Sequence, residues 1–442
     1  MRTATFLAAT LLAGTFLSAA STSAAAQQDE MQQQLEAIQQ RLLQIERMLA
    51  AGQASGFQGF NEAAMQDMQK RDLESTGGGM PQVDEDADQD GLTNAEEGML
   101  GTDAANADTD GDALLDGWEV HGVNGIDLHK LGANPLRKDI FVEMDYMVRG
   151  SASNGLGPNT DVLDRIRQVF ADAPVLNPNG SRGISIHLEL GNEVPYDDDL
   201  NPAPDEFAAI KRTEFDSRRL PVFHYMIWAD RYNGGTSSGN AFAIPNSDFI
   251  VTLGAWNSGK GGDDDEKVGT FIHELGHNLG LKHGGSDHVG YKPNHLSVMN
   301  YAFQTAGILV GSDRKFDFQR FALSSLDETS LIDSLGLGGS SNLRGYHTRI
   351  RQHGLFDIPA DGPIDWNNNG VIDRRPVMVD LNRDLLFNVL RATPDEWNSI
   401  IYDGGAIGTK RNLGLMQQRM DQTRKLLPEV ELTEEMDKQQ GN

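Results

Sequence analysis

The feature that most constrains this chain is a short run that holds three histidines and one glutamate at spacings suited to a single metal ion. His273 and His277 are four residues apart, about one helical turn, so their ring nitrogens can converge on one ion. Glu274 can then reach a water on that ion. Gly280 permits a left-handed turn that ends the helix and returns His283 to the metal as a third ligand.

The surrounding sequence is that of an amphipathic helix. Apolar side chains recur on the face opposite the two histidines: Val268, Phe271, Ile272, Leu275 and Leu279. Acidic residues 263–266 stand where the helix should begin, and negative charge is favourable at the positive end of its dipole. The pattern predicts a helix with one face on a core and both imidazoles facing an open cleft. The alternative, a surface helix with solvated histidines, is disfavoured by the added glycine and third histidine.

A second motif follows at residues 297–301, where Met299 occupies a short Ser-Val-Met-Asn-Tyr turn. With the histidine run, it resembles the metzincin clan of zinc peptidases, which combine a long zinc-binding motif with a Met-turn. The resemblance extends over roughly residues 135–427 and is specific at these two motifs.

The resemblance implies a role for each motif residue. His273, His277 and His283 would bind catalytic Zn²⁺, with Glu274 as the general base. Met299 would be a hydrophobic base beneath the metal. Tyr301 matches the tyrosine that astacin-like and serralysin-like members use as an extra zinc ligand or oxyanion donor; a tyrosine packed in the core is the alternative.

Strand and helix patterns alternate through the same region, which predicts an α/β sheet. The predicted strands are 140–147, 184–190, 220–228, 240–244 and 249–253, with a helix at 162–171. The resemblance implies a twisted, mixed five-stranded sheet in an upper part that ends at His283, followed by a lower part. In that arrangement strand 240–244 is an antiparallel edge to which an extended peptide can add. Residues 323–337 are predicted to be helical. His288 and His295 match no ligand spacing and are expected to be surface or structural residues.

Two acidic repeats within residues 83–121 precede this domain. Their carboxylates follow the spacing of twelve-residue calcium loops: Asp86, Asp88, Asp90 and Glu97, then Asp108, Asp110, Asp112, Asp116 and Glu119. The tandem resembles bacterial thrombospondin type 3 repeats, which implies structural Ca²⁺. Ala113 stands where glycine would make the sharp turn, so the second loop is expected to bind more weakly. An acidic solvated linker is the alternative. For residues 365–384, a calcium loop and an Asx-rich turn are equally favoured.

The ends of the chain carry patterns of a different kind. Residues 1–26 have one arginine, an apolar run and a small-residue end, which predicts a cleaved signal peptide and a secreted or periplasmic protein. Residues 27–51 predict a short amphipathic heptad helix, for weak self-association or for docking on the same protein. Residues 52–82 are expected to be a flexible linker and 428–442 a disordered acidic tail after a possible helix at 416–427. Whether residues 27–80 form an inhibitory prosegment is left open.

Composition narrows the classes of partner. The net charge of −28 disfavours nucleic acid and anionic lipid, and no apolar run is long enough for stable membrane insertion. Without cysteine the chain has no disulfide and no cysteine-switch latency device. The predicted function is a secreted zinc endopeptidase that acts on protein or peptide. The alternatives are a zinc amidohydrolase acting on cell-wall or glycoprotein substrates, and a non-catalytic calcium-dependent adhesion or matrix protein.

Overall fold

A computed structural model describes residues 85–149, 156–402 and 431–438 of the 442-residue chain. All of them fall in one compact unit, residues 84–442. The predicted signal peptide, heptad helix and linker, and the predicted helix at 416–427, lie outside the described residues. No helix among the described residues is both long and apolar enough to cross a membrane.

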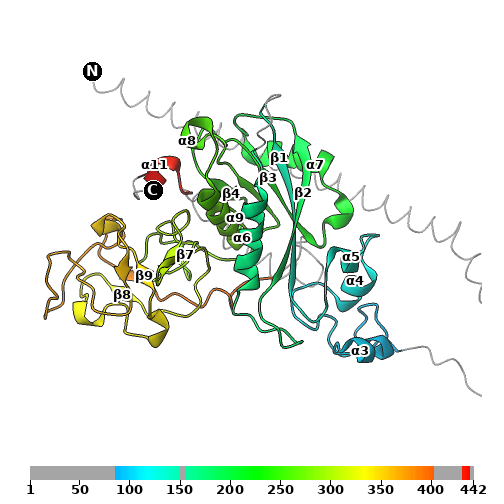
Figure 1. Ribbon diagram of the computed structural model, residues 1–442, viewed down its shortest axis with the longest axis horizontal. Helices are drawn as coiled ribbons and strands as arrows, with labels where there is room; N and C mark the ends of the chain where they lie inside the picture. Colours follow the sequence, from blue (N-terminus) through cyan, green and yellow to red (C-terminus); the bar gives the residue numbers. More distant parts are fainter. Residues whose placement is uncertain (1–84, 150–155, 403–430, 439–442) are drawn as a thin grey trace, which may run out of the picture. The chain divides into compact units, whose positions relative to one another are not determined.

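A five-stranded mixed sheet forms the centre of the fold, with strand order β2-β1-β3-β5-β4 (Figure 1). Its strands are β1 (Asp139–Met147), β2 (Ser185–Val194), β3 (Phe223–Trp228), β4 (Gly239–Ala241) and β5 (Asp248–Val251). Four strands are parallel, and β4 pairs antiparallel with β5 at one edge. The central strands β1 and β3 are buried along almost their whole length because both faces of the sheet are covered. The predictions of an α/β fold and of an antiparallel edge strand are confirmed.

Two layers cover the sheet. Helices α6 (Thr160–Ala171) and α9 (Asp264–Asn278) lie on one face, where Phe170 and Phe271 share a core cluster with Met144 and Met226. On the opposite face, α7 (Ala203–Glu214) contributes Phe207 to a second cluster. Successive side chains of a strand point to opposite faces, so β1 supplies both clusters.

Helix α9 has the termini that the sequence predicts. The Asp263 carboxylate accepts from the backbone N–H of Glu266, and the Glu266 carboxylate accepts from that of Asp263, which completes a capping box. The helix ends at Asn278, and Gly280 takes a left-handed φ of +89°. The predicted apolar stripe is buried. A short α8 (Trp256–Gly259) precedes this helix.

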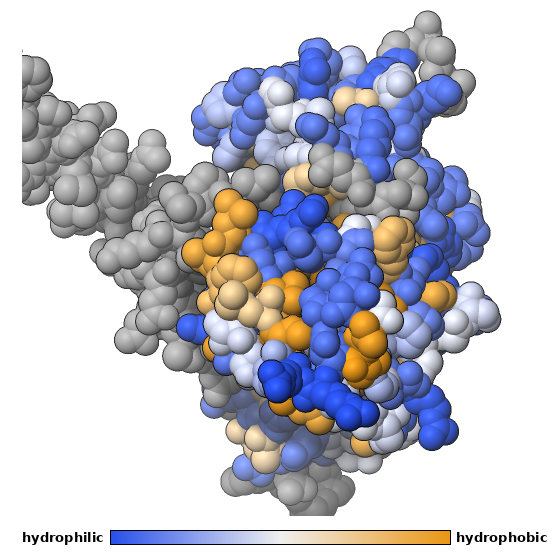
Figure 2. All heavy atoms as spheres, turned by 90° about the vertical axis from the view of Figure 1, so that its left-hand side faces the viewer, coloured by the Kyte–Doolittle hydropathy of each residue, from blue (hydrophilic) through white to orange (hydrophobic). Residues whose placement is uncertain are grey.

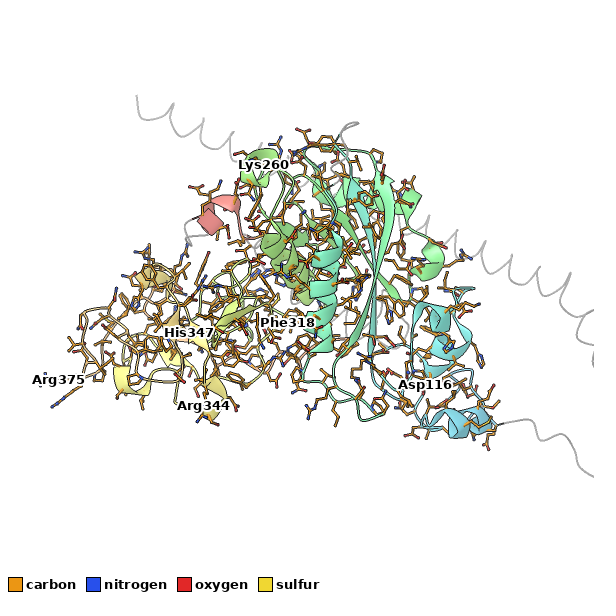
Figure 3. The ribbon with its side chains drawn as sticks, viewed as in Figure 1. Asp116, Lys260, Phe318, Arg344, His347 and Arg375 are labelled. Atoms are coloured by element: carbon orange, nitrogen blue, oxygen red, sulfur yellow. The ribbon has the colours of Figure 1, made fainter. Side chains whose placement is uncertain are left out.

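The acidic repeats contain two short helices, α3 (Asn94–Leu100) and α4 (Asp116–His121), and a third, α5 (Leu128–Leu131), follows them. Leu114 and Leu128 are buried in the same cluster as α7 and Phe141 of β1. The repeats therefore pack directly on the sheet. Figure 3 marks Asp116 at the start of α4.

Residues 284–402, here called the loop-rich part, contain little regular structure. This part has three two-stranded antiparallel sheets. In these, β6 (Ile308–Val310) pairs with β7 (Asp313–Lys315), β8 (Leu326–Asp327) with β11 (Val389–Leu390), and β9 (His347–Thr348) with β10 (Ile358–Pro359). Single 3₁₀ turns are η2 (Asp333–Leu335), η3 (Ser341–Leu343) and η4 (Arg351–His353), and η1 (Ser217–Arg219) precedes β3. Phe318 attaches this part to the upper one through an edge contact with Phe170 of α6 (Figure 3).

The predicted helix at 323–337 is wrong. Leu323 and Leu331 instead pair their backbones with Thr393 and Val377. The buried Glu328 carboxylate accepts two backbone N–H groups from distant residues. These long-range bonds outweigh the weak helical preference of the segment.

Exposed apolar side chains are numerous on the loop-rich part. They include Leu335, Phe356, Met378 and residues 385–387. Figure 2 views the molecule from a side where apolar patches alternate with hydrophilic residues.

The prediction of a disordered tail is wrong for residues 431–438. Helix α11 (Glu434–Lys438) forms there, and Leu432 is fully buried in the main core cluster. Met436 packs against that cluster as well. Two apolar side chains and a backbone bond from Ser238 to Leu432 therefore anchor a segment that its acidic composition would leave free.

Candidate metal centre

Three imidazoles converge at the C-terminal half of α9. Their Nε2 atoms are 3.1 Å apart between His273 and His277, 2.9 Å between His277 and His283, and 3.2 Å between His283 and His273. Tetrahedral zinc with Zn–N bonds of about 2.0–2.1 Å holds its ligand atoms about 3.3–3.4 Å apart. The three nitrogens thus stand close to the spacing that one such ion requires.

Backbone carbonyls fix two of these rings. Nδ1 of His273 donates to the carbonyl of Val298 at 2.8 Å, and Nδ1 of His277 donates to that of Leu281 at 2.9 Å. A carbonyl oxygen can only accept, so the proton of each neutral ring must be on Nδ1. The lone pair of each Nε2 then faces the centre, as metal binding needs.

Two of the three histidines, His273 and His277, are held in the neutral form. Burial lowers the pKa of His273, and burial together with the neighbouring imidazoles holds the pKa of His277 well below its ordinary value. Neutral imidazole is the form that binds a metal ion. Gly280 and the turn after it bring His283 back to the centre, as the sequence predicts.

Glu274 belongs to α9, and its side chain points at the edge strand β4 and is fully buried. Neither of its carboxylate oxygens has a hydrogen bond of normal geometry with any described residue. Burial, and then the nearby Glu431 carboxylate, raise the pKa of Glu274 well above its ordinary value, while the backbone amide of Ala241 opposes that shift. A buried carboxylate without partners needs a proton or a bound water, and a metal-bound water beside the histidines would satisfy it.

Met299 lies directly beneath the helix. A methyl group added at Gly276 would stand 2.4 Å from its Sδ, so the sulfur fills the space that this glycine leaves. Tyr301 reaches the centre itself: its Oη is 2.9 Å from Nε2 of His283, and its ring stacks on His273 at a centroid distance of 5.7 Å. Burial raises the pKa of Tyr301 well above 10, so the phenol keeps its proton. Tyr301 is therefore placed at the candidate centre.

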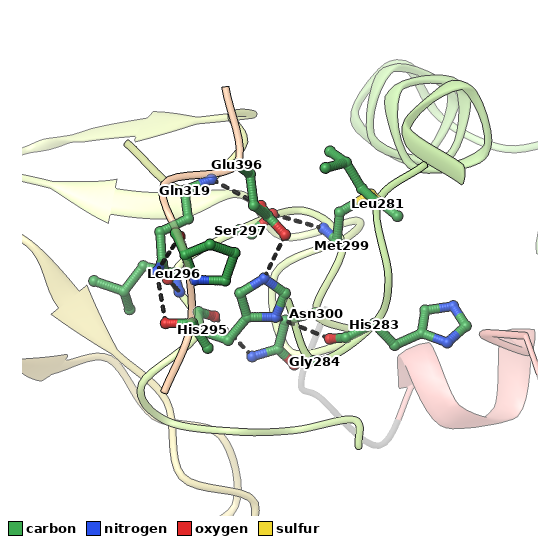
Figure 4. Close-up of polar contacts among 12 residues, drawn as sticks. Leu281, His283, Gly284, His295, Leu296, Ser297, Met299, Asn300, Gln319 and Glu396 are labelled. Atoms are coloured by element: carbon green, nitrogen blue, oxygen red, sulfur yellow. Dashed lines mark hydrogen bonds and ion pairs between the residues drawn. The ribbon is translucent and has the colours of Figure 1, made fainter. Parts of the chain in front are cut away.

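His295 holds the backbone of the turn at His283 and is not part of the histidine group that could bind a metal ion (Figure 4). Its Nδ1 donates to the carbonyl of His283 at 2.9 Å, and its Nε2 is 2.8 Å from Oε1 of Glu396. The other oxygen of Glu396 accepts from the backbone N–H of Gln319. All of this is fully buried, so the structural alternative for His295 is confirmed and the surface one is wrong. His288 is partly buried, and its ring lies 6.4 Å from that of His283.

Glu431 joins the histidines from the far end of the chain. Its Oε2 is 3.5 Å from Nε2 of both His273 and His283, and its Oε1 is 3.9 Å from Nε2 of His277. Burial opposes ionisation of Glu431, but its closeness to the imidazoles of His283 and His273 lowers its pKa well below the usual range. The four residues form one buried group that can hold a metal ion. Sequence reasoning missed Glu431 because no motif spacing links it to α9.

The acidic repeats bring most of their predicted ligands together. Three metal-type clusters form: Asp86 with Asp88 and Asp90, Asp108 with Asp110 and Asp112, and Asp112 with Glu119 and Asp139. Both oxygens of Asp88 and of Glu119, and one of Glu97, are buried without a hydrogen-bond partner in the described part of the chain. Such carboxylates call for cations.

Glu97 and Asp116 are predicted ligands that join none of these clusters, and Asp139 joins one without having been predicted. Asp116 belongs to none of the clusters, because its oxygens accept the N–H and O–H of Thr109. Asp139, which sequence reasoning missed, begins β1 and completes the third cluster from outside the repeats. In residues 365–384, the carboxylates of Asp365 and Asp380 accept nearby backbone N–H groups and join no metal-type cluster of the described residues.

Comparison with known proteins gives no independent assignment. No protein-family model matches this chain, and no curated protein is significantly similar to it in sequence.

Proposed function

We propose that this protein is a zinc-dependent endopeptidase of the metzincin type. The observation that carries the proposal is the convergence of three buried Nε2 atoms next to an antiparallel edge strand, beside a buried glutamate that has no hydrogen bond of normal geometry with any described residue. Met299 beneath α9 and Tyr301 beside His283 add support from the second motif.

Zinc held by the three histidines would polarise a peptide carbonyl and lower the pKa of water. The chain's own residues supply the rest. Glu274 takes the proton of the attacking water and returns it to the leaving amine. Tyr301, protonated, donates a hydrogen bond to the substrate oxygen that gains charge. The carbonyls of Val298 and Leu281 keep the lone pairs of two imidazoles aimed at the centre.

The edge of the sheet supplies the substrate-binding element. Strand β4 is the last in the sheet order, and α9 packs beside it. An extended peptide that adds to this edge would run past Glu274, because Gly239 lies against the Glu274 side chain. The proposed substrate is therefore protein or peptide in extended form.

The test compares the full chain with Glu274→Gln, using a peptide-library digest and elemental analysis. Parent protein should contain zinc and cleave peptides, whereas the folded, zinc-loaded variant should be slower by about 10²- to 10⁴-fold. Asp265→Asn, an exposed acid on the same helix, is the matched control and should keep the parent rate. Cleavage by Glu274→Gln at the parent rate would refute the mechanism. Hydrolysis of cell-wall or glycoprotein amides alone would move the proposal to an amidohydrolase.

We propose in addition that Ca²⁺ binds the acidic repeats. The support is the set of metal-type carboxylate clusters, in which both oxygens of Asp88 and of Glu119 are buried without a hydrogen-bond partner in the described part of the chain. Calcium there would fasten the repeats to the sheet, because Asp139 of β1 shares the cluster with Asp112 and Glu119. The signal-like pattern of residues 1–26 supports a secreted or periplasmic protein.

A further inference from the structure

Residues 431–438, here called the C-terminal strap, extend the edge of the sheet. Thr433 forms an antiparallel bridge with Ser237. Ser238 donates its backbone N–H to the carbonyl of Leu432 at 2.8 Å, and Glu434 donates to the carbonyl of Thr236 at 3.2 Å. Residues 236–238 lead into β4, so the strap occupies backbone positions that an added peptide strand would use.

The strap also places a carboxylate at the metal centre. The distances of 3.5, 3.5 and 3.9 Å from Glu431 oxygens to the three Nε2 atoms are close to the edges of a ligand tetrahedron. Carboxylate oxygen is a normal zinc ligand at about 2.0–2.2 Å. Glu431 therefore stands at the fourth vertex, the position that a catalytic site keeps open for water.

Contacts on both sides hold the strap in place. Asn257 of α8 donates its backbone N–H to Glu434 at 3.0 Å. Thr305, which follows the Met-turn, donates its hydroxyl to Asp437. Leu432 is fully buried between these points, in the core cluster that contains α9. The strap is thus docked through backbone, apolar and polar contacts rather than through Glu431 alone.

We propose that the C-terminal strap is an inhibitor built into this chain, which lies on the peptide-binding edge and closes the metal centre with Glu431. This inference rests on the proposed peptidase function. The active form is then the one in which the strap has left the edge, and a peptide substrate competes with the strap for the same backbone groups. Release of Glu431 frees the fourth position and removes a negative charge from beside Glu274.

The experiment uses the full chain, with Glu431→Gln as the test variant. Glu435→Gln is the matched control, because Glu435 is an exposed acid in the same segment. With a fluorogenic peptide, Glu431→Gln should cleave about tenfold faster than the parent if the closed form is about 90 % populated. Glu435→Gln should match the parent. A double Glu274→Gln, Glu431→Gln variant should lose this gain, which shows that the gain comes from the same site.

A second measurement does not need activity. Acetohydroxamate, a small metal-binding anion, is titrated into the cobalt-loaded proteins and followed by visible absorption. Removal of the competing carboxylate should tighten binding to Glu431→Gln by about tenfold, on the same population argument, with no change in Glu435→Gln. Leu432→Asp places a charge in the buried position and should release the strap, so it should also raise both the cleavage rate and the hydroxamate affinity. It replaces Glu431→Gln as the test variant if that protein does not fold.

The outcomes separate the two proposals. Tighter hydroxamate binding with no peptide cleavage by any variant supports the strap and refutes the peptidase function. Parent-level cleavage that neither Glu431→Gln nor Leu432→Asp raises, with hydroxamate affinity unchanged, overturns the strap and leaves the peptidase function standing.

Discussion

Gly239 of the edge strand lies against Glu274 of α9 so closely that a methyl group on Gly239 would stand 2.7 Å from Oε1 of the glutamate. The same methyl would also stand 2.7 Å from the carbonyl oxygen of Ile250 on the neighbouring strand. Strand and carboxylate therefore touch without any intervening side chain. In the proposed mechanism this contact brings the backbone of a bound peptide to the group that moves the proton.

Gly239→Ala should lower peptidase activity by about tenfold or more, since displacement of a catalytic group by about 1 Å can cost as much as 10²-fold. The histidines are untouched, so zinc content should remain at the parent level. Steady-state kinetics with elemental analysis make the measurement. Gly235→Ala is the control, because a methyl there meets only an ordinary contact at 3.5 Å. Equal losses in both variants would mean that the contact with Glu274 has no special role.

Tyr301→Phe separates an oxyanion donor from a packed tyrosine. The ring keeps its stacking on His273, and only the hydroxyl 2.9 Å from His283 is lost. Loss of one hydrogen bond to developing charge should reduce kcat/KM by about 10- to 10³-fold, with the melting temperature nearly unchanged. Tyr346→Phe, a tyrosine packed on Phe321 outside the metal centre, provides the comparison. If kcat/KM stays at the parent value, the role of Tyr301 is packing alone.

The buried pair of His295 and Glu396 predicts a stability effect. Glu396 joins the ring of His295 to the backbone of Gln319, and His295 in turn holds the carbonyl of His283 (Figure 4). Glu396→Gln leaves one of these two contacts without an acceptor, because an amide has a single oxygen, and this should cost about 1–3 kcal/mol in the free energy of unfolding. Urea denaturation of the zinc-loaded protein measures it. The exposed isosteric change Glu435→Gln should cost less than about 0.5 kcal/mol, and a similar small loss in Glu396→Gln would contradict the importance of the pair.

Residues whose partners are close in sequence were predictable. Helix α9 follows from a 3.6-residue apolar period, from the Asp263 and Glu266 cap and from Gly280, all of which act within a few residues. The convergence of His273 with His277 and His283 follows from the same local geometry. The edge position of β4 was expected only through a resemblance.

Residues brought in by tertiary structure were not predictable. Glu431 reaches the metal centre, and Asp139 reaches the repeats, through folding of segments whose own spacing carries no metal pattern. Its acidic composition predicts that the strap is disordered, yet burial of Leu432, packing of Met436 and backbone bonds to residues 236–238 hold it in place. Local periodicity likewise misplaced a helix at 323–337, where backbone partners lie far away in the chain.

The stability of the repeats should depend on pH in the absence of calcium and lose that dependence when calcium is bound. In the metal-free state, burial raises the pKa of Asp110 to about 7, while Lys138 opposes this; burial and the neighbouring carboxylates raise that of Glu119 to about 12. The unfolded chain releases these protons near pH 4, so between about pH 4 and 7 it binds fewer protons than the folded state. Stability of the metal-free repeats therefore falls as pH rises through that window. Bound Ca²⁺ takes the place of the protons and should remove the fall.

Hydrogen exchange of backbone amides in residues 85–131 tests this on protein stripped of metal and reloaded with one equivalent of zinc. Protection factors, corrected for intrinsic exchange rates, should drop between pH 5 and pH 7.5 and should recover when Ca²⁺ is added. At a free Ca²⁺ concentration of 100 times its dissociation constant, the recovery corresponds to about 2.7 kcal/mol of stabilisation. Glu119→Gln should weaken the calcium response, and Asp161→Asn, an exposed acid on α6, should leave it intact. Protection that is equal at both pH values and unaffected by Ca²⁺ would show that these buried carboxylates hold neither proton nor cation. In that case the acidic repeats could not fasten to β1 through Asp139 in the way proposed.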